Sequence, residues 1–275
     1  LAGAAFSGGL SGKGAFELLP EKTGWSCELT PEKAALTGNG FVFSGLSGTL
    51  RLAEGEAEDR NPGGEIRFDS VSAGPVEVEN GALTFRLPRP GECDVLSGGG
   101  TVWGGRARLS APFTFHSGSG AAEAGVVVRG LEWAALLKAF GLAPDLIGGR
   151  GDGMLLWHLD PGGKAPSLVS AELTSVGTQT LKLETLEPYL VEEKGVSRKM
   201  VEFLRDFECR TLRVRAEEET GGDILLELAV SGRPAGQGYK KLSRSVDPAD
   251  FGLDGEIDFS VNYRIPGWQK AKEKK

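Results

Sequence analysis

Apolar and polar residues alternate along most of the first 130 positions of this chain. Ile66 and Phe68 stand among Glu65, Arg67 and Asp69, and the same period of two recurs in run after run. Because successive side chains of a strand point to opposite faces of a sheet, this pattern predicts strands with one apolar and one polar face. A continuous groove or core face is expected from the apolar members of these runs, which are Phe41, Phe43, Ile66, Phe68, Leu83, Phe85, Leu87, Phe113, Phe115, Val126, Val128, Leu226, Leu228 and Val230.

Short glycine-bearing segments separate these runs. They are Gly38-Asn39-Gly40, Asn61-Pro62-Gly63-Gly64 and Asn80-Gly81. Asn-Gly between alternating runs is a strong hairpin signal, because both residues accept a positive φ. We therefore expect consecutive strands to be antiparallel neighbours. Each strand should keep one parity, since a slip by one residue would turn a whole apolar set outward.

The clearest helix signal lies near the middle of the chain. Trp133, Leu136, Leu137 and Phe140 follow one another at intervals of three, one and three, which places them on one stripe of an α-helix. Gly141 follows, and glycine is the preferred residue just past a helix end. Because β-rich stretches flank this helix, we expect its apolar stripe to pack on strands as a lid or a plug.

A second helical region is predicted over residues 188–207. Pro188 suits the first helical position, and Gly195 divides the region into two pieces. The residues at helical spacing are Val196, Met200, Phe203, Leu204 and Phe207.

The last alternating run, residues 256–265, is long and has no slip. Its apolar positions include Ile257, Phe259, Val261 and Tyr263, and Pro266 ends it. Nothing after it in this sequence is capable of pairing with it, so we expect an open sheet edge that accepts a partner strand by β-augmentation. The alternative is internal pairing with residues 226–230 on one side and a covering loop on the other.

Together these elements predict a mainly β fold, namely an elongated antiparallel sheet curled into a trough with two short helical insertions. The 42 glycines and 14 prolines fit many turns between short strands. A second sheet layer, as in a sandwich, is the other way to cover the apolar face. We expect residues 1–130 to form a first meander and residues 131–275 to form a helix-containing segment that continues it.

Charge and candidate chemistry narrow the function classes. A formal net charge of −7, without a clustered Lys/Arg stripe, argues against a nucleic-acid partner. Cys27, Cys93 and Cys209 are widely spaced and form no CxxC motif, so they are interpreted as small apolar residues on strands. His116 and His158 are interpreted as structural. Because no catalytic or metal-binding motif emerges, we expect a non-enzymatic protein without a cofactor.

The order of the later elements resembles a known family. A helix is followed by the glycine-rich residues 146–153, a second helix ending near Phe207, a strand over residues 226–232 and the pair Arg233-Pro234. This order, over roughly residues 83–265, is similar to the C-terminal region of YdbH-like proteins, which belong to the AsmA-like, bridge-type family of the Gram-negative envelope. Such proteins often carry Asn-Pro in the turn where this chain has Arg233-Pro234.

The resemblance implies a periplasmic segment of an inner-membrane-anchored bridge that carries phospholipid acyl chains along a hydrophobic groove toward the outer membrane, with no cofactor. It also implies a small outer-membrane lipoprotein that adds a strand at the C-terminal edge. Membrane contact would come through an N-terminal anchor missing from this sequence. The chain begins with Leu1, and no stretch approaches the roughly 20 apolar residues of a membrane span.

Two other classes stay open from the residues alone. A secreted or surface adhesin or carbohydrate-binding β-module would need an aromatic platform on its polar face, whereas the five tryptophans are scattered along the chain. A hydrolase on a β-scaffold would need two carboxylates that converge.

Overall fold

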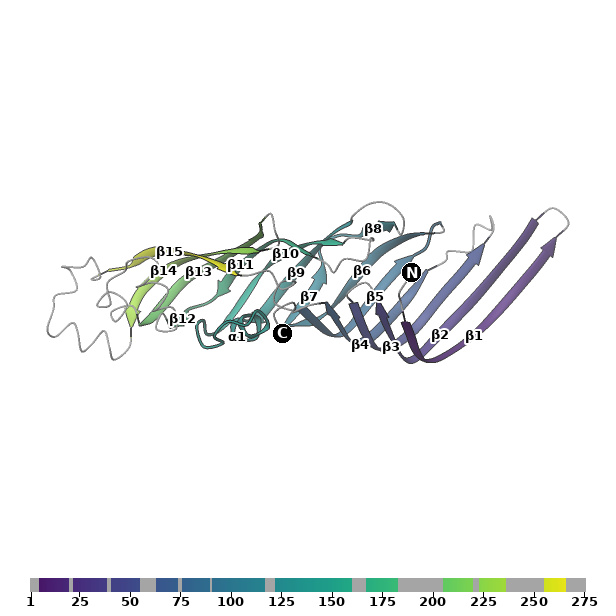
Figure 1. Ribbon diagram of the computed structural model, residues 1–275, viewed down its shortest axis with the longest axis horizontal. Helices are drawn as coiled ribbons and strands as arrows, with labels where there is room; N and C mark the ends of the chain where they lie inside the picture. Colours follow the sequence, from purple (N-terminus) through teal and green to yellow (C-terminus); the bar gives the residue numbers. More distant parts are fainter. Residues whose placement is uncertain are drawn as a thin grey trace. The chain divides into compact units, whose positions relative to one another are not determined.

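The computed structural model describes residues 5–19, 22–38, 41–54, 63–73, 76–89, 91–116, 122–159, 167–182, 205–219, 223–235 and 255–265. Within these residues the chain forms strands and a single α-helix (Figure 1). The elements in chain order are β1 (Ala5–Leu19), β2 (Lys22–Gly38), β3 (Phe41–Glu54), β4 (Gly63–Ala73), β5 (Val76–Arg86), β6 (Glu92–Val102), β7 (Gly105–Leu109), β8 (Phe113–His116), β9 (Ala122–Glu132), α1 (Trp133–Ala139), β10 (Arg150–Leu159), β11 (Ser167–Val176), β12 (Gln179–Lys182), β13 (Asp206–Glu218), β14 (Ile224–Ala235) and β15 (Ile257–Ile265).

The strands form one open antiparallel sheet of 15 strands. Its order is β1-β2-β3-β4-β5-β6-β7-β9-β10-β11-β13-β14-β15, while β8 pairs with β6 and β12 pairs with β13. Neighbours in the sheet are mostly neighbours in the sequence, and Figure 1 shows β1 to β5 side by side in chain order. The predicted mainly β meander is therefore confirmed.

The first predicted helix is confirmed as α1, and its end follows the expected chemistry. Phe140 is the C-cap residue of α1, and the next residue, Gly141, adopts a left-handed φ of +73°. The Gly141 N–H donates to the Lys138 carbonyl at 3.1 Å, and the Leu142 N–H donates to the Leu137 carbonyl at 2.8 Å. This pair of bonds is a Schellman motif, in which glycine carries the left-handed residue without a steric penalty.

Most of the second predicted helical region, residues 183–204, lies outside the described residues. The prediction of a helical Phe207 is wrong, because Phe207 lies in β13 opposite Leu181 and Pro234. Its spacing of four from Phe203 imitates a helix, but the strand alternation begins at Asp206. Pro234 also lies within β14 rather than in a turn, at a position where the ladder with β15 has ended.

The chain forms two compact units, which we describe separately. Unit 1 comprises Leu1–Val102, Arg106–Val128 and Leu155–Val169. Unit 2 comprises Trp103–Gly105, Arg129–Met154 and Ser170–Lys275. The expected division of the chain between residues 130 and 131 stays a prediction.

The strands of unit 1 do not keep one parity from end to end, so that prediction is wrong. In β5, Val76 and Val78 are the apolar positions of the first half, whereas Leu83 and Phe85 are those of the second half, which has the opposite parity. Asn80 stands between them with a left-handed φ of +50°. Asn80-Gly81 is therefore not a hairpin turn but an irregularity inside one long strand. It changes which face of the sheet the odd-numbered and even-numbered side chains after it point to.

Similar left-handed residues occur in the neighbouring strands. Lys33 in β2 has a φ of +47°, and Gly45 in β3 has a φ of +62°. The residues beside them meet across the sheet, because Ala34 pairs with Leu46. We call this row of parity switches in β2, β3 and β5 the crease of unit 1.

At the crease, position 80 requires a residue that tolerates a left-handed backbone. Replacement by valine is expected to destabilise the protein by ~1–2 kcal/mol, because the β-branched side chain clashes in a left-handed backbone. Replacement by glycine should leave the stability unchanged or raise it slightly. Urea denaturation followed by circular dichroism measures both variants. Glu79→Val, at the exposed neighbouring position, is the matched control, and an equal loss in Asn80→Val and Glu79→Val would contradict the explanation.

Candidate functional site

The register of β2 to β8 brings apolar side chains of unit 1 onto shared rows, since residues opposite each other in neighbouring strands share a face. We call their sum the unit 1 apolar face. The row on one side of the crease contains Leu36, Phe43, Val71, Val78 and Val102. The rows on the other side contain Ile66 with Leu83, and Leu29, Leu50, Phe85, Val95 and Phe113.

Apolar side chains from both sides of the crease pack against one buried cluster, so this part of the sheet is curled. Phe43 and Phe68 lie on opposite sides of the crease, yet their ring centroids are 5.8 Å apart with the edge of one ring toward the other. In a straight strand, Ile66 and Val71 would be about 16 Å apart, but both pack against the same cluster. The buried members of this cluster are Ala34, Leu46 and Phe68, at 0%, 6% and 5% exposure.

Most of the unit 1 apolar face is only half-buried. Phe41, Phe43, Ile66, Leu83 and Phe85 are all of intermediate exposure. Every described element of unit 1 is a strand of the one sheet, so the described residues of unit 1 supply no second layer over this face. A contiguous apolar surface of this kind marks a binding surface for lipid or protein.

The opposite face of the same strands is charged. Arg51 pairs with Glu28 across β2 and β3 at 3.0 Å, and Arg67 pairs with Glu65 along β4 at 3.2 Å. Glu77 and Glu79 of β5 are exposed. This contrast between the two faces is the one that the period of two predicts.

Most of the predicted groove residues fall on strands of unit 1. Phe68 and Val128 are buried there, and Leu87 lies one residue beyond β5. Phe113 and Phe115 lie on β8, which begins at Phe113 after β7 has ended at Leu109. The half-buried ones are Phe41, Phe43, Ile66, Leu83, Phe85, Leu87, Phe113, Phe115 and Val126. Their contact with a ligand stays a prediction.

Sequence reasoning missed several residues of the unit 1 apolar face. They are Ala34, Leu36, Leu46 and Val71. Ala34, Leu36 and Leu46 belong to strands that switch parity at the crease, so a single alternation pattern omits them, and Val71 of β4 pairs with Val78 on the far side of Asn80. At the left-handed positions before Ala34 and Leu46, Gly45 carried a sequence signal, because glycine accepts a positive φ, whereas Lys33 carried none.

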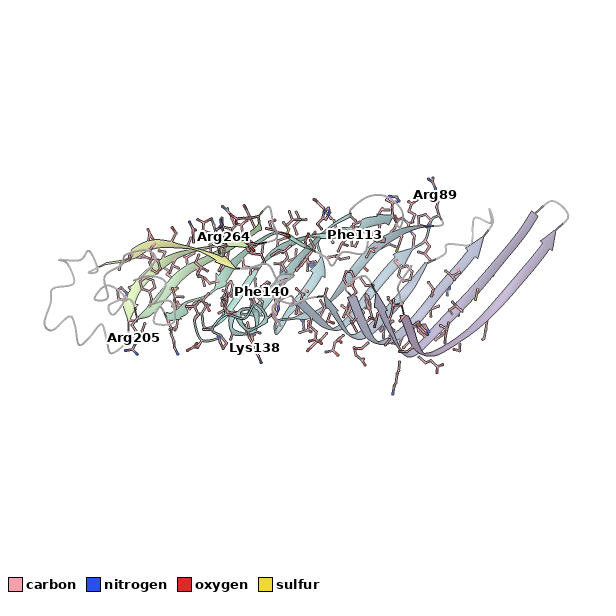
Figure 2. The ribbon with its side chains drawn as sticks, viewed as in Figure 1. Arg89, Phe113, Lys138, Phe140, Arg205 and Arg264 are labelled. Atoms are coloured by element: carbon pink, nitrogen blue, oxygen red, sulfur yellow. The ribbon has the colours of Figure 1, made fainter. Side chains whose placement is uncertain are left out.

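Unit 2 differs because its helix α1 packs against β10. Trp133 is 0% exposed and Leu137 is 5% exposed. The Trp133 ring lies so close to Gly151 of β10 that an added Cβ would collide with it. The Trp133 N–H donates to the Gly149 carbonyl at 3.2 Å. Phe140, labelled beside α1 in Figure 2, stacks at 6.1 Å on Trp103.

Other apolar side chains of unit 2 are equally enclosed. The side chains with 0% or 1% exposure are Leu131, Ile147, Leu181, Phe207 and Leu212. Of the three predicted groove residues in unit 2, Leu228 and Val230 are 3% and 4% exposed, and Leu226 is half-buried. Unit 2 therefore encloses a core of its own, whereas unit 1 leaves its apolar face partly open.

The sequence matches the model of a known protein family. The model of the YdbH-like family, described as intermembrane phospholipid transport protein YdbH, matches residues 2–155, which is more than half of the chain. The chain belongs to the YdbH-like family. The match includes β1 to β9 and α1 and ends within β10. Searches among curated proteins and among solved structures give no match.

The YdbH-like match and the resemblance seen in the sequence rest on different parts of the chain. The resemblance spans roughly residues 83–265, so the two overlap over residues 83–155. In the described part of this YdbH-like chain, no helix is both long and apolar enough to span a membrane. No group of three His, Cys, Asp or Glu side chains in that part is placed to hold a metal ion.

At the end of the sheet path of this YdbH-like chain, β15 pairs with β14 through Phe259 opposite Val230, Val261 opposite Leu228 and Tyr263 opposite Leu226. No described strand pairs with the other side of β15. The internal pairing that we expected as an alternative is thus present on one side. Ile257 and Phe259 are half-buried, and Phe259 packs edge-to-face against Phe207 at 5.3 Å.

The three cysteines of this YdbH-like chain lie on strands, as expected. Burial raises the pKa of the Cys209 thiol to about 12. For Cys93, burial first and the Asp94 carboxylate second raise the pKa above its usual value. All three are free thiols.

Cys209 is therefore expected to resist a thiol reagent such as DTNB at pH 8 until the protein unfolds, whereas the half-buried Cys27 reacts in the native state. A raised pKa stabilises the fold below the unfolded value of 9.0, and that stabilisation is lost as the pH rises toward about 12. Cys209→Ala should lose less stability over that range than the unchanged chain. Rapid native labelling of Cys209 would contradict the burial.

Proposed function

We propose that the unit 1 apolar face binds the acyl chains of phospholipids and serves as a segment of a lipid path between membranes. The observation that supports this most is the curled, half-buried apolar surface with a charged reverse side and no second layer among the described residues. Membership of the YdbH-like family, described as intermembrane phospholipid transport, supports phospholipid as the cargo.

The physics favours a carrier over a reaction site. An acyl chain leaves a bilayer at a cost that each methylene buried on an apolar wall offsets by ~0.8 kcal/mol. The phenyl rings and branched side chains of Phe43, Ile66 and Leu83 offer such a wall without a hydrogen-bond requirement. The lipid headgroup keeps its hydration at the open side of the curl.

The rest of the proposal concerns the whole protein. We infer a periplasmic segment of an inner-membrane-anchored bridge that carries phospholipid toward the outer membrane. The family description supports a place in the cell envelope. The anchor and the direction of transport follow from the resemblance alone.

Lipid extraction tests the proposal. The protein is produced in a bacterial periplasm and purified without detergent, and its organic extract is examined by mass spectrometry. We expect phospholipid at a defined ratio to protein. A folded protein that carries no phospholipid, and takes up none from phospholipid vesicles, would contradict the proposed function.

The terminal strand β15 is proposed to accept a strand from a small outer-membrane lipoprotein. Its position at the end of the sheet path supports this, because no strand among the described residues pairs with its other side, and strand addition uses the backbone of a sheet edge. Val261→Pro removes a backbone N–H from the strand and is expected to abolish partner capture. Asn262→Ser is the matched control at the next residue. Circular dichroism must match the unchanged protein, and a well-folded Val261→Pro variant that still captures its partner would rule out this docking mode.

A further inference from the structure

The apolar residues of the two units differ in what occupies the space in front of them. In unit 1, Phe43, Phe85 and Phe113 are half-buried on a face that no other described element of unit 1 covers. In unit 2, Trp133 and Leu137 of α1 are at most 5% exposed, and the Trp133 ring packs directly on β10 at Gly151. A surface that is already packed to this degree leaves no room for an acyl chain.

We propose that phospholipid occupies the unit 1 apolar face alone, and that in unit 2 the helix α1, with Phe140 and Trp103, takes the place of cargo. This inference rests on the proposed function and assigns its binding site to particular residues. It assigns Leu228 and Val230, at 3% and 4% exposure, to an internal core. It removes both from the predicted lipid contacts, together with the half-buried Leu226 of the same strand.

The contacts of α1 show that it is built into unit 2 rather than resting on it. Two backbone bonds tie the segment after α1 to β12, from the Gly148 N–H to the Thr180 carbonyl and from the Lys182 N–H to the Leu146 carbonyl, both at 2.8 Å. Between them, Ile147 forms an isolated bridge with Leu181. The Trp103 turn adds a further bond, from the Glu132 N–H to the Trp103 carbonyl at 2.8 Å.

Two other observations agree with this assignment. Trp103 holds a left-handed φ of +47° although it is a large aromatic residue, and its ring packs on Phe140. Strain of this kind persists only where the surrounding packing requires it. The family match includes β1 to β9, which carry the unit 1 apolar face, together with α1 and the start of β10, whereas β11 to β15 lie outside the matched residues.

Five phenylalanines allow a test that changes little else. The photoreactive residue p-benzoylphenylalanine replaces Phe43, Phe85 or Phe113 in unit 1, and Phe140 or Phe259 in unit 2, one at a time. The full chain is loaded from phosphatidylethanolamine vesicles, irradiated and examined by mass spectrometry for phospholipid adducts. Thermal unfolding of each variant confirms that it is folded.

We expect adducts at the three unit 1 positions and none at the two unit 2 positions. Adducts at Phe140 or Phe259 with the same yield as at Phe43 would overturn the inference while leaving the proposed function intact. Absence of adducts at all five positions would overturn both.

Discussion

Replacing Leu137 of α1 by glutamate is expected to unfold unit 2, with a loss of roughly 3–5 kcal/mol. Leu137 is 5% exposed and lies on the same helix stripe as the fully buried Trp133. The substitution removes a packed leucyl side chain and puts a carboxylate in its place. A carboxylate buried without a cationic partner is costly. The only cationic residue of α1 is Lys138, and its side chain is exposed.

Ala134→Glu is the matched control for this prediction. Ala134 is exposed on the same helix, near its N-terminus, where a negative charge is favourable to the helix dipole. We expect this variant to be as stable as the unchanged chain or slightly more stable. Chemical denaturation followed by tryptophan fluorescence separates the two, and equal stability of both variants would show that α1 does not hold unit 2 together.

Replacing Phe43 of β3 by aspartate is expected to remove bound phospholipid while leaving the sheet folded. The ring of Phe43 is half-buried on the unit 1 apolar face beside Phe68. A carboxylate at this position would be buried against acyl chains instead of being hydrated by water, which costs free energy. A loss of about 1.4 kcal/mol in binding free energy already lowers the affinity for phospholipid about tenfold. Mass spectrometry of the extracted lipid, normalised to protein, measures the loss.

The neighbouring residue supplies the control. Val42 is 44% exposed and alternates with Phe43, so it lies on the opposite face. Val42→Asp should therefore keep its full phospholipid content. Equal lipid loss in both variants, or normal lipid content in a folded Phe43→Asp protein, would mean that the unit 1 apolar face is not where the lipid binds.

The period of two was sufficient to predict strands, their charged reverse faces and the antiparallel order. Each of these features depends on neighbouring residues in one chain segment. The predicted helix end at Gly141 is local in the same sense, since its chemistry lies within two residues of the helix. Phe43, Ile66 and Leu83, which the period of two places among the apolar positions, are partly buried against one cluster, and their contact with lipid stays a prediction.

The crease was not predictable from the same pattern. Asn80-Gly81 has the composition of a hairpin turn, and only the pairing of β5 with β4 and β6 over its whole length shows that the strand continues through it. Likewise, the partners that bury Leu228 come from β13 and β15, whose positions in the sheet depend on contacts distant in the sequence. A residue that lines an open surface and one that enters a closed core have the same local signature.

The most direct measurement of the central claim is nitroxide accessibility on the two faces of β3. A spin label is attached at Phe43→Cys or Val42→Cys in a chain whose native cysteines are replaced by alanine, and its collisions with oxygen and with a water-soluble nickel chelate are recorded by electron paramagnetic resonance. On addition of phospholipid vesicles, we expect the label at position 43 to lose contact with nickel and gain contact with oxygen, while the label at position 42 does not change. An unchanged label at position 43, or the same change at both positions, would contradict the assignment of the unit 1 apolar face as the acyl-chain site.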